Sequence, residues 1–294
     1  MSSLSTQDSR LYATAAALGV FALTFGYLRN KSQKAAIEEK ENVYETKRSV
    51  DEYLLMHYGG KKELLPYDFG PHSALEFPKR CAKVCEDLGF DSKARVLDLG
   101  CAVGGATFHL ASYFESVVGI DFSHAFVNAA NAIKASGTMK YSYRIEGEIL
   151  ADSEVVIDSS IDRQRCTFKQ GDACNLDLED LGQFEIVLGA NLVCRLPEPA
   201  VFLTSVKDLI VEGGYLVLPS PYTWLEQFTE KSKWMGGYYD KNGKPVRSID
   251  DFKKYLLPNF EFIREENMPF FIKETARKHQ WSVSHCTVWK RRTV

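Results

Sequence analysis

The stretch ARVLDLGCAVGGATFHLASYFESVVGID, residues 94–121, contains the pattern that decides the fold. Its opening run, 95–99, is short and mostly apolar, which is typical of a strand buried on both faces. A glycine-rich turn follows, then an amphipathic helix over 107–114 and a second short strand over 117–120. The stretch therefore predicts the strand–turn–helix–strand unit of a doubly wound α/β fold.

The turn after the first strand reads GCAVGG over residues 100–105, and Asp121 stands at the end of the second strand. Glycines at such a turn let the backbone bend sharply and let a ligand approach main-chain N–H groups. An acid about 20 residues beyond the turn is placed to accept hydrogen bonds from a ribose diol. The dinucleotide fingerprint GxGxxG fits poorly, and any βαβ unit with a tight turn is the plainer alternative. Turn, helix and terminal acid together favour a nucleotide site.

The same turn resembles the first motif of class I S-adenosylmethionine (SAM) methyltransferases, (D/E)xGxGxG, with Asp98 as its leading acid. Ala102 stands where the middle glycine is usual, and alanine suits the turn if its φ is negative. The resemblance implies SAM as the cofactor, and it implies that Asp172, after the third strand, contacts the adenine amino group. The implied cofactor-binding residues are Asp98, Gly100, Ala102, Gly104, Asp121, Phe122, Asp172 and Ala173.

The remaining elements predict a seven-stranded Rossmann-like class I methyltransferase sheet with helices on both faces. Five further strands are expected, over 166–169, 184–189, 215–218, 260–266 and 285–290. The last two are compatible with antiparallel pairing, the usual ending of this fold. Residues 139–165 show alternating apolar positions between two expected strands, which predicts an inserted hairpin or arm beside the core.

Composition excludes several classes of protein. At 294 residues the chain is long enough for one large domain plus a tail, by the soft rule of about 150 residues per domain. The fractions of 45% hydrophobic and 26% charged residues are ordinary for a globular protein. A net charge of −3 gives no electrostatic support to a nucleic-acid partner, so none is expected. The seven cysteines include no CxxC pair, so no metal site is expected.

Changes in composition divide the chain into four parts. Residues 1–10 are polar and are expected to be a disordered tail, and 11–28 contain no charged residue. Residues 29–41 are rich in charge and are expected to be a solvated connector. Apolar residues at helical spacing begin after that, so the methyltransferase domain is expected over 42–294.

The uncharged segment over 11–28 predicts a single-pass N-terminal transmembrane anchor. As a helix it would span about 27 Å, just enough for a hydrocarbon core. Basic residues gather after it, which favours a catalytic domain facing the cytosol from the endoplasmic reticulum or the mitochondrial outer membrane. A signal peptide and an amphipathic targeting helix are the alternatives. The segment has no basic leading region, which a signal peptide would have, and no polar face, which an amphipathic targeting helix would have.

Several longer stretches resemble the methyltransferase module of ovothiol biosynthesis, the 4-mercaptohistidine N-methyltransferase family. They include DLGCAVGGATFHLA, VVGIDFSHAFVNAAN, GDACNL, ANLVCRLPEPAVFL, SPYTWLEQFT and FIKETARKHQWSVSHCTVWKR, and the likeness covers about residues 42–294. NLVCRLPEP also resembles the NLLDRC-type segment of a protein histidine methyltransferase family. Both resemblances imply an imidazole nitrogen, here of a 4-mercaptohistidine-like small molecule, as the methyl acceptor.

Methyl transfer from a sulfonium is an in-line displacement that depends chiefly on holding nitrogen and methyl carbon aligned. Asn191, expected at the end of the fourth strand, is the first candidate for orienting the ring, although a capping residue there is the alternative. Tyr222 is expected to flank the ring, together with Trp224. Arg277, Arg195 and Lys273 are candidate partners for the carboxylate of an amino-acid acceptor. The catalytic set predicted is Asn191, Tyr222 and Arg277.

Three other functions compete with this one. The apolar segment alone suggests a membrane-associated methyltransferase for a lipid-like or quinone acceptor. The NLVCRLPEP stretch suggests a protein histidine as acceptor. A non-catalytic SAM-binding scaffold is the third, although Asp98, Asp121 and Asp172 argue against it.

Overall fold

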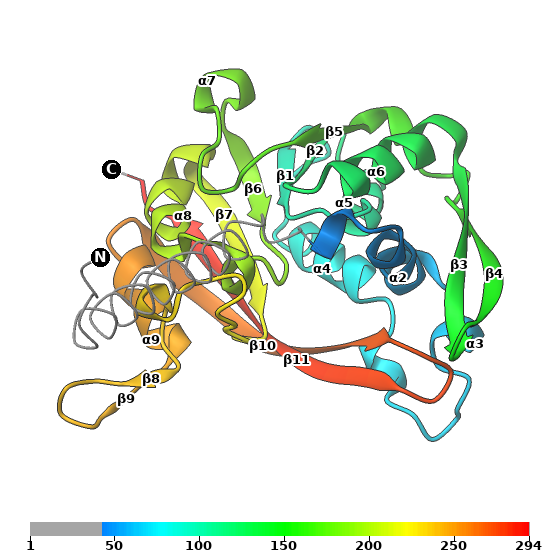
Figure 1. Ribbon diagram of the computed structural model, residues 1–294. Helices are drawn as coiled ribbons and strands as arrows, with labels where there is room; N and C mark the ends of the chain where they lie inside the picture. Colours follow the sequence, from blue (N-terminus) through cyan, green and yellow to red (C-terminus); the bar gives the residue numbers. More distant parts are fainter. Residues whose placement is uncertain (1–42, 294) are drawn as a thin grey trace, which may run out of the picture. The chain divides into compact units, whose positions relative to one another are not determined.

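A seven-stranded sheet is the framework of residues 43–293, which are the residues described by the computed structural model (Figure 1). The strand order is β5-β2-β1-β6-β7-β11-β10. The first five strands in that order run parallel, and β11 runs antiparallel to both of its neighbours. The strands are β1 (Arg95–Leu99), β2 (Ser116–Asp121), β5 (Cys166–Gln170), β6 (Phe184–Leu188), β7 (Ile210–Ser220), β10 (Phe260–Lys273) and β11 (His279–Arg291). The predicted seven-stranded Rossmann-like sheet is confirmed.

Helices cover both faces of the sheet because neighbouring strand residues point to opposite sides. Val96 of β1 belongs to one buried cluster and Leu97 to the other. The helices α2 (Lys47–Tyr58), α4 (Phe77–Glu86), α5 (Gly105–Leu110) and α6 (His124–Ser136) pack into the first cluster. The helices α7 (Leu178–Leu181), α8 (Pro199–Ser205) and α9 (Ser248–Leu256) pack into the second. The core is therefore two apolar layers separated by the sheet.

The predicted insertion is a two-stranded antiparallel hairpin outside the main sheet. It consists of β3 (Thr138–Glu146) and β4 (Ile149–Val156). Its inner face packs on the core, with Tyr141 and Val155 buried against the first cluster. The hairpin and the short helix α3 (Lys61–Leu64) are joined by the Ser153 hydroxyl, which donates to the Glu63 carboxylate at 2.6 Å.

The last two strands are longer than the sequence analysis predicted. Only residues 285–290 of β11 pair with β7, whereas the pairing of β11 with β10 continues back to His279. The hairpin therefore projects past the edge of the sheet where the parallel strands end. Its turn is held to β3, because the Ala276 N–H donates to the Ile145 carbonyl at 2.9 Å, and to the Tyr67 hydroxyl, which donates to the Ala276 carbonyl at 3.0 Å.

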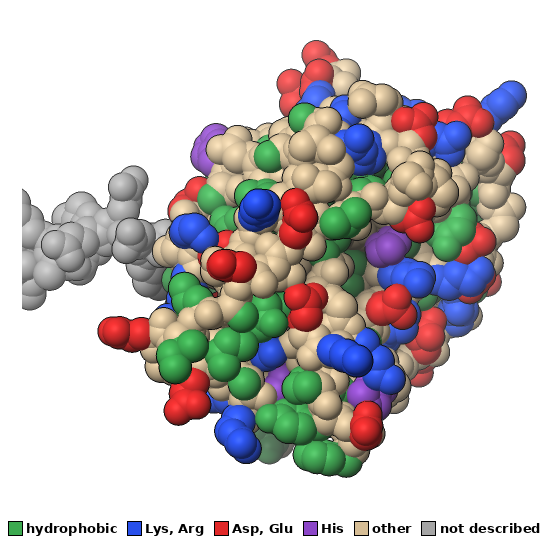
Figure 2. Space-filling view, turned by 90° about the vertical axis from the view of Figure 1, so that its right-hand side faces the viewer, with side chains coloured by type: hydrophobic (Ala, Val, Ile, Leu, Met, Phe, Trp, Pro, Cys, Tyr) green, Lys and Arg blue, Asp and Glu red, His purple; other side chains and the backbone are tan. Residues whose placement is uncertain are grey.

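Apolar side chains are exposed near these chain reversals. Ile149 and Leu150 lie at the β3–β4 turn, and Trp281 lies near the β10–β11 turn. Phe69 is also exposed, and its ring stacks on the ring of Tyr67. Figure 2 faces this side and shows hydrophobic side chains gathered over its lower part, among charged side chains of both signs.

The sequence also predicted a transmembrane helix as part of the fold, and from it a membrane partner and a membrane location. Within residues 43–293 no helix is long and apolar enough to cross a membrane. The longest helix in that range, α6, has 13 residues. It is about 20 Å long, against the ~30 Å of a hydrocarbon core. The described residues therefore do not support the membrane-spanning fold or the location built on it. The predicted anchor over 11–28 and its flanking segments 1–10 and 29–41 lie outside the described residues.

Candidate active site

The glycine-rich turn connects the end of β1 to α5. Gly100 and Gly104 have φ values of +71° and +87°, in the left-handed region that glycine adopts freely. Ala102 was expected to have a negative φ, and this expectation is wrong, because its φ is +47°. The Ala102 N–H donates to Asp121 Oδ2 at 2.8 Å. This hydrogen bond to Asp121, at the end of β2, therefore stabilises the strained conformation of Ala102 in the turn.

Asp98 lies under the turn and is almost fully buried, with 1% of its surface exposed. Its Oδ2 accepts a hydrogen bond from the Thr107 hydroxyl of α5 at 2.7 Å. Burial raises the pKa of Asp98 to about 7, although the bonds from Thr107 oppose the shift. Asp98 is therefore a carboxyl whose charge can change near neutral pH.

Asp121 and Asp172 follow the two strands beyond β1 at the same edge of the sheet. Asp121 accepts the N–H groups of Ala102 and Ser123, and burial raises its pKa while those bonds oppose the rise. Asp172 accepts the Cys174 N–H at 2.8 Å. The exposed Phe122 ring follows Asp121, and Ala173 packs against the second cluster. All eight residues predicted to bind the cofactor thus lie at or beyond the carboxyl ends of three adjacent strands.

Helix α2 covers the turn, which the sequence analysis did not predict. The Gly105 N–H donates to His57 Nδ1 at 3.1 Å, and the Tyr58 hydroxyl donates to the Val103 carbonyl at 2.7 Å. Close packing around His57 lowers its pKa to about 3, so the ring is neutral and can accept. The apolar stripe of α2 was recognisable in the sequence, but no motif shows that its two polar rings meet the turn.

Asn191 lies just beyond β6, also with a left-handed φ of +54°. Its N–H donates to the Pro219 carbonyl at 2.8 Å, which ties this loop to β7. Its side-chain Oδ1 accepts the Ser284 hydroxyl of β11 at 2.6 Å. The amide nitrogen has no hydrogen-bond partner within residues 43–293. The side chain is thus held in place with a donor still available.

Tyr222 follows β7, and its hydroxyl pairs with His285 Nδ1 at 2.9 Å. His285 Nε2 lies 3.1 Å from a carboxylate oxygen of Glu265. Burial raises the pKa of Tyr222, so the phenol is neutral at physiological pH. Ser284 and His285 are consecutive strand residues and point to opposite faces of β11. The partners of Asn191 and Tyr222 therefore lie on opposite sides of this strand.

Arg277 is exposed in the turn between β10 and β11, apart from Asn191 and Tyr222. Lys273, at the end of β10, is buried with its ammonium bonded to the Glu63 carbonyl. Trp224 is also buried, and its indole N–H donates to the Ser248 hydroxyl at 2.9 Å. Of the cations named from sequence, Arg195 is the one on the same loop as Asn191, four residues after it, at the end of the short helix η4 (Val193–Arg195).

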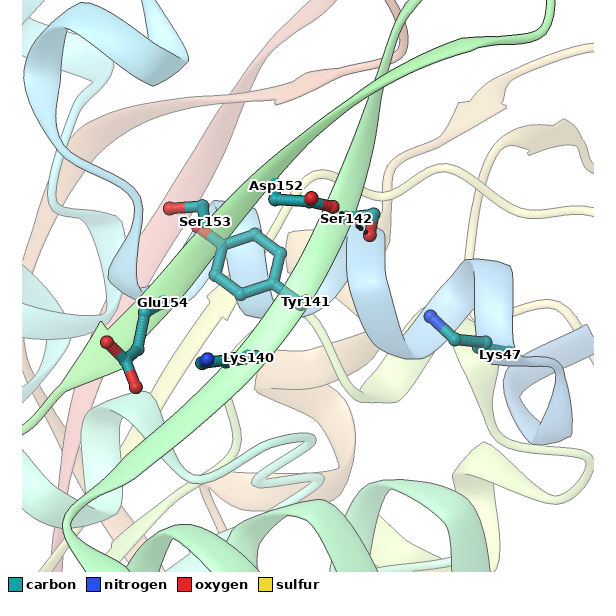
Figure 3. A pocket seen from close by; sticks show the side chains of 7 residues that line it. All are labelled: Lys47, Lys140, Tyr141, Ser142, Asp152, Ser153 and Glu154. Carbon is teal, nitrogen blue, oxygen red and sulfur yellow. Dashed lines mark hydrogen bonds between the residues drawn. The ribbon is translucent and has the colours of Figure 1, made fainter.

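A cavity of about 510 Å³ lies elsewhere, between the start of α2 and the outer strands of the insertion (Figure 3). Lys47 comes from α2, and the other lining residues come from β3 and β4. Lys140 and Glu154 are cross-strand partners, and the Ser142 hydroxyl donates to Asp152 at 2.8 Å. These charged and polar side chains of the cavity therefore lie opposite partners on the neighbouring strand. Asp98, Asp121 and Asp172, the acids at the sheet edge, do not line the cavity.

Comparison with known proteins fits this geometry. Residues 97–218 match the family model described as a methyltransferase domain. Magnesium protoporphyrin IX methyltransferase from Synechocystis PCC 6803, solved with bound SAM, is 16% identical with a TM-score of 0.51, over 87% of this chain and 99% of that one. A SAM-dependent methyltransferase from Methanosarcina mazei is 17% identical with a TM-score of 0.48, over 71% and 98%. No curated protein sequence matches the chain.

The sheet order is that of the class I fold, and residues 97–218 match a methyltransferase domain. The protein is a SAM-dependent methyltransferase, and its cofactor is SAM. The polar groups present suit that cofactor. Carboxylate oxygens of Asp121 and Asp172 accept hydrogen bonds, which is what a ribose diol and an adenine amino group require. Nothing in these matches bears on the methyl acceptor, so the resemblance to the ovothiol module stays a prediction.

Proposed function

We propose that this methyltransferase acts on an imidazole nitrogen of a small molecule resembling 4-mercaptohistidine. The long sequence stretches that resemble the ovothiol module support this acceptor. The placement of Asn191 at the end of β6, held by Ser284 of β11, is the structural observation on which the proposal mainly rests. An amide side chain presents an acceptor and a donor side by side, which suits a ring with two unlike nitrogens.

The proposed role of Asn191 is to orient the ring. A carbonyl oxygen has two lone pairs, and Ser284 uses one of those on Asn191 Oδ1. The second can accept the N–H of a neutral imidazole. The lone pair of the other ring nitrogen then points away from Asn191, free to attack a carbon. Such positioning can contribute several kcal/mol, up to about 7–11 in ideal cases.

The proposed cofactor contacts follow the strand ends. Asp121 would hold the ribose hydroxyls and Asp172 the adenine amino group, with Asp98 placing a carboxyl under the turn. SAM supplies an activated methyl group on a sulfonium. The chain itself binds and orients both molecules. A flanking role for Tyr222 stays a prediction, because its partner His285 and the partner of Asn191, Ser284, lie on opposite faces of β11. A role for Arg277 stays a prediction.

The test is mass spectrometry of products after incubating the protein with SAM and a panel of acceptors. The panel contains 4-mercaptohistidine, histidine, histidine peptides and quinols. We expect one methyl group to appear on a ring nitrogen of mercaptohistidine. Methylation of a peptide or of a quinol alone would refute the proposed acceptor.

Asn191→Ala provides the second part of the test. Loss of the orienting amide is expected to lower kcat/KM for mercaptohistidine by about 100-fold, since small misplacements have effects of that size. The dissociation constant of SAM should not change. Asn242→Ala, in the exposed loop between β8 (Tyr238–Tyr239) and β9 (Pro245–Val246), is the matched control.

A further inference from the structure

We propose that Arg195 forms an anion-binding subsite that receives the carboxylate of an amino-acid acceptor. This inference rests on the proposed function, because it names the group by which that acceptor is held. Arg195 ends η4, on the same loop as Asn191 and only four positions after it. A ring oriented by Asn191 would therefore carry its amino-acid part toward a nearby cation.

The guanidinium is fixed by neutral groups alone. Its Nη1 donates to the Thr223 carbonyl at 2.8 Å and to the Cys194 carbonyl at 3.1 Å, and Nη2 donates to the Thr223 hydroxyl at 3.2 Å. Within residues 43–293 no carboxylate lies within 4.0 Å of it. Arg48, by contrast, pairs with Glu52 at 2.7 Å on the surface of α2. The charge of Arg195 is thus left for another anion.

Aromatic rings also lie against the same guanidinium. Its carbon lies 4.8 Å from the centre of the Phe228 ring. Tyr44, from the 3₁₀ helix η1 (Val43–Glu45), stacks on Phe228 with centroids 5.9 Å apart and planes at 15°. The Tyr44 hydroxyl is hydrogen-bonded by Arg195 and by Tyr53. A planar cation held in this way loses little freedom when it binds, which favours a charge-assisted hydrogen bond to a carboxylate.

The subsite adjoins the proposed cofactor pocket. Tyr53 feels the charges of both Arg195 and Asp121. The Tyr44 carbonyl accepts the Ser123 hydroxyl at 3.0 Å, two residues beyond Asp121. The Glu45 carboxylate accepts the N–H groups of His124 and Ala125 at the start of α6. The contacting rings of Tyr44 and Tyr53 therefore lie near both Arg195 and the segment that begins at the ribose acid.

A single guanidinium with Asp121 nearby suits a singly charged anion better than a phosphate, whose second charge would meet that carboxylate. The predicted ligand is thus an α-carboxylate. The test compares 4-mercaptohistidine with its decarboxylated amine, using the full chain saturated with S-adenosylhomocysteine. Calorimetry gives the two dissociation constants for wild type, Arg195→Gln and Arg195→Lys.

We expect wild type to bind the amino acid about 10- to 100-fold more tightly than the amine, since hydrogen bonds to charged groups have effects of that order. Arg195→Gln should remove this preference, and Arg195→Lys should restore only part of it. Arg247→Gln, a substitution of an exposed arginine before α9, should keep the full preference. A SAM dissociation constant equal to that of wild type shows that each variant is folded.

Equal affinities for the two probes in wild type, or no binding of either, would overturn the subsite, and so would an Arg195→Gln protein that keeps the preference. The methylation assay is a separate readout. Methylated mercaptohistidine with an unchanged preference in Arg195→Gln refutes the subsite and leaves the proposed function standing. If Arg195→Gln abolishes the preference for the amino acid over the amine, but the wild type does not methylate mercaptohistidine, the subsite is supported and the proposed reaction is refuted.

Discussion

At the scale of single residues, one position in the turn and one beneath it each combine an unfavourable local state with a contact that offsets it. Asp98 is a buried acid whose carboxylate accepts a hydrogen bond from the Thr107 hydroxyl. Ala102 takes a left-handed conformation and donates to Asp121. Such local costs are typical of ligand sites, where the surrounding structure imposes them. Asp98 and Ala102 each lead to a testable prediction.

Asp98 should make SAM binding depend on pH. Its pKa of about 7 means that about half of the molecules carry a neutral Asp98 at neutral pH. SAM has a net positive charge and should bind the carboxylate better, so binding releases a proton. The dissociation constant should fall by up to about tenfold per unit as the pH rises toward 7, and level off above it. Calorimetry between pH 5.5 and 8.5 measures this, and Asp98→Asn should give a flat profile. A pH-independent wild type would contradict the prediction.

Ala102→Gly should stabilise the protein. A left-handed alanine costs about 1–2 kcal/mol, and the greater freedom of glycine in the unfolded chain offsets about 0.4–1 kcal/mol of the gain. The expected net increase in the free energy of unfolding is about 1 kcal/mol or less, visible as a Tm higher by roughly 1–3 °C. Ala132→Gly, on the exposed side of α6, is the control and should lower the stability instead. A lower Tm for Ala102→Gly would show that the turn gains from the methyl group.

At the scale of elements, α2 is joined to the turn by His57 and Tyr58 from its last two residues. Neither bond follows from helix periodicity, which predicts only the buried side of the helix. The pairing depends on a glycine at 105, because a Cβ there would lie 2.5 Å from His57 Nδ1. Removing either bond should loosen α2 over the cofactor site.

His57→Leu should lower the free energy of unfolding by about 1–3 kcal/mol, because the Gly105 N–H loses its acceptor. It should also change the response to acid. The pKa of His57 is lowered from 6.5 to about 3, so the unfolded chain takes up a proton near pH 6.5 that the folded chain does not. This contribution to stability is complete above pH 6.5 and is lost progressively as the pH falls toward 3.

Urea unfolding between pH 4 and 8 checks both effects, and hydrogen exchange of residues 47–58 reports the loosening. Wild type should lose more stability than His57→Leu on acidification. Arg48→Gln, on the exposed side of the same helix, should stay within about 0.5 kcal/mol of wild type. Equal acid sensitivity of wild type and His57→Leu would show that His57 is protonated in the folded protein.

At the scale of the whole molecule, the domain boundary proposed near residue 42 can be tested by truncation. A chain beginning at residue 42 keeps η1, α2 and the bonds of Glu45 to α6. We expect it to unfold cooperatively and to bind SAM as tightly as the full chain. A chain beginning at residue 61 lacks α2 and should bind SAM at least about tenfold more weakly, since a whole side of the site is missing. Calorimetry and thermal unfolding compare the three proteins. If the chain beginning at residue 61 bound SAM as tightly as the full chain, α2 would be excluded from the site.

The sequence predicted the sheet well because each of its central strands is a local apolar run between turn residues. The extension of β10 over 267–273 and of β11 over 279–284 was missed, because these two segments run past the parallel strands and pair with each other instead. The φ of Ala102 depends on a bond from another strand. The Arg195 cluster joins residues 44, 195 and 228, and no local pattern connects positions so far apart.

All seven cysteines lie in the described part of the chain and none forms a disulfide. Six are buried, and only Cys174 is partly accessible. Burial raises the pKa of this thiol to about 11, so alkylating reagents should react slowly at neutral pH and faster in mild alkali. The natural chain therefore offers one selective labelling position, two residues from Asp172. A fluorescent dye attached there would report ligand binding next to Asp172, the residue proposed to hold the adenine amino group, without any cysteine having to be removed.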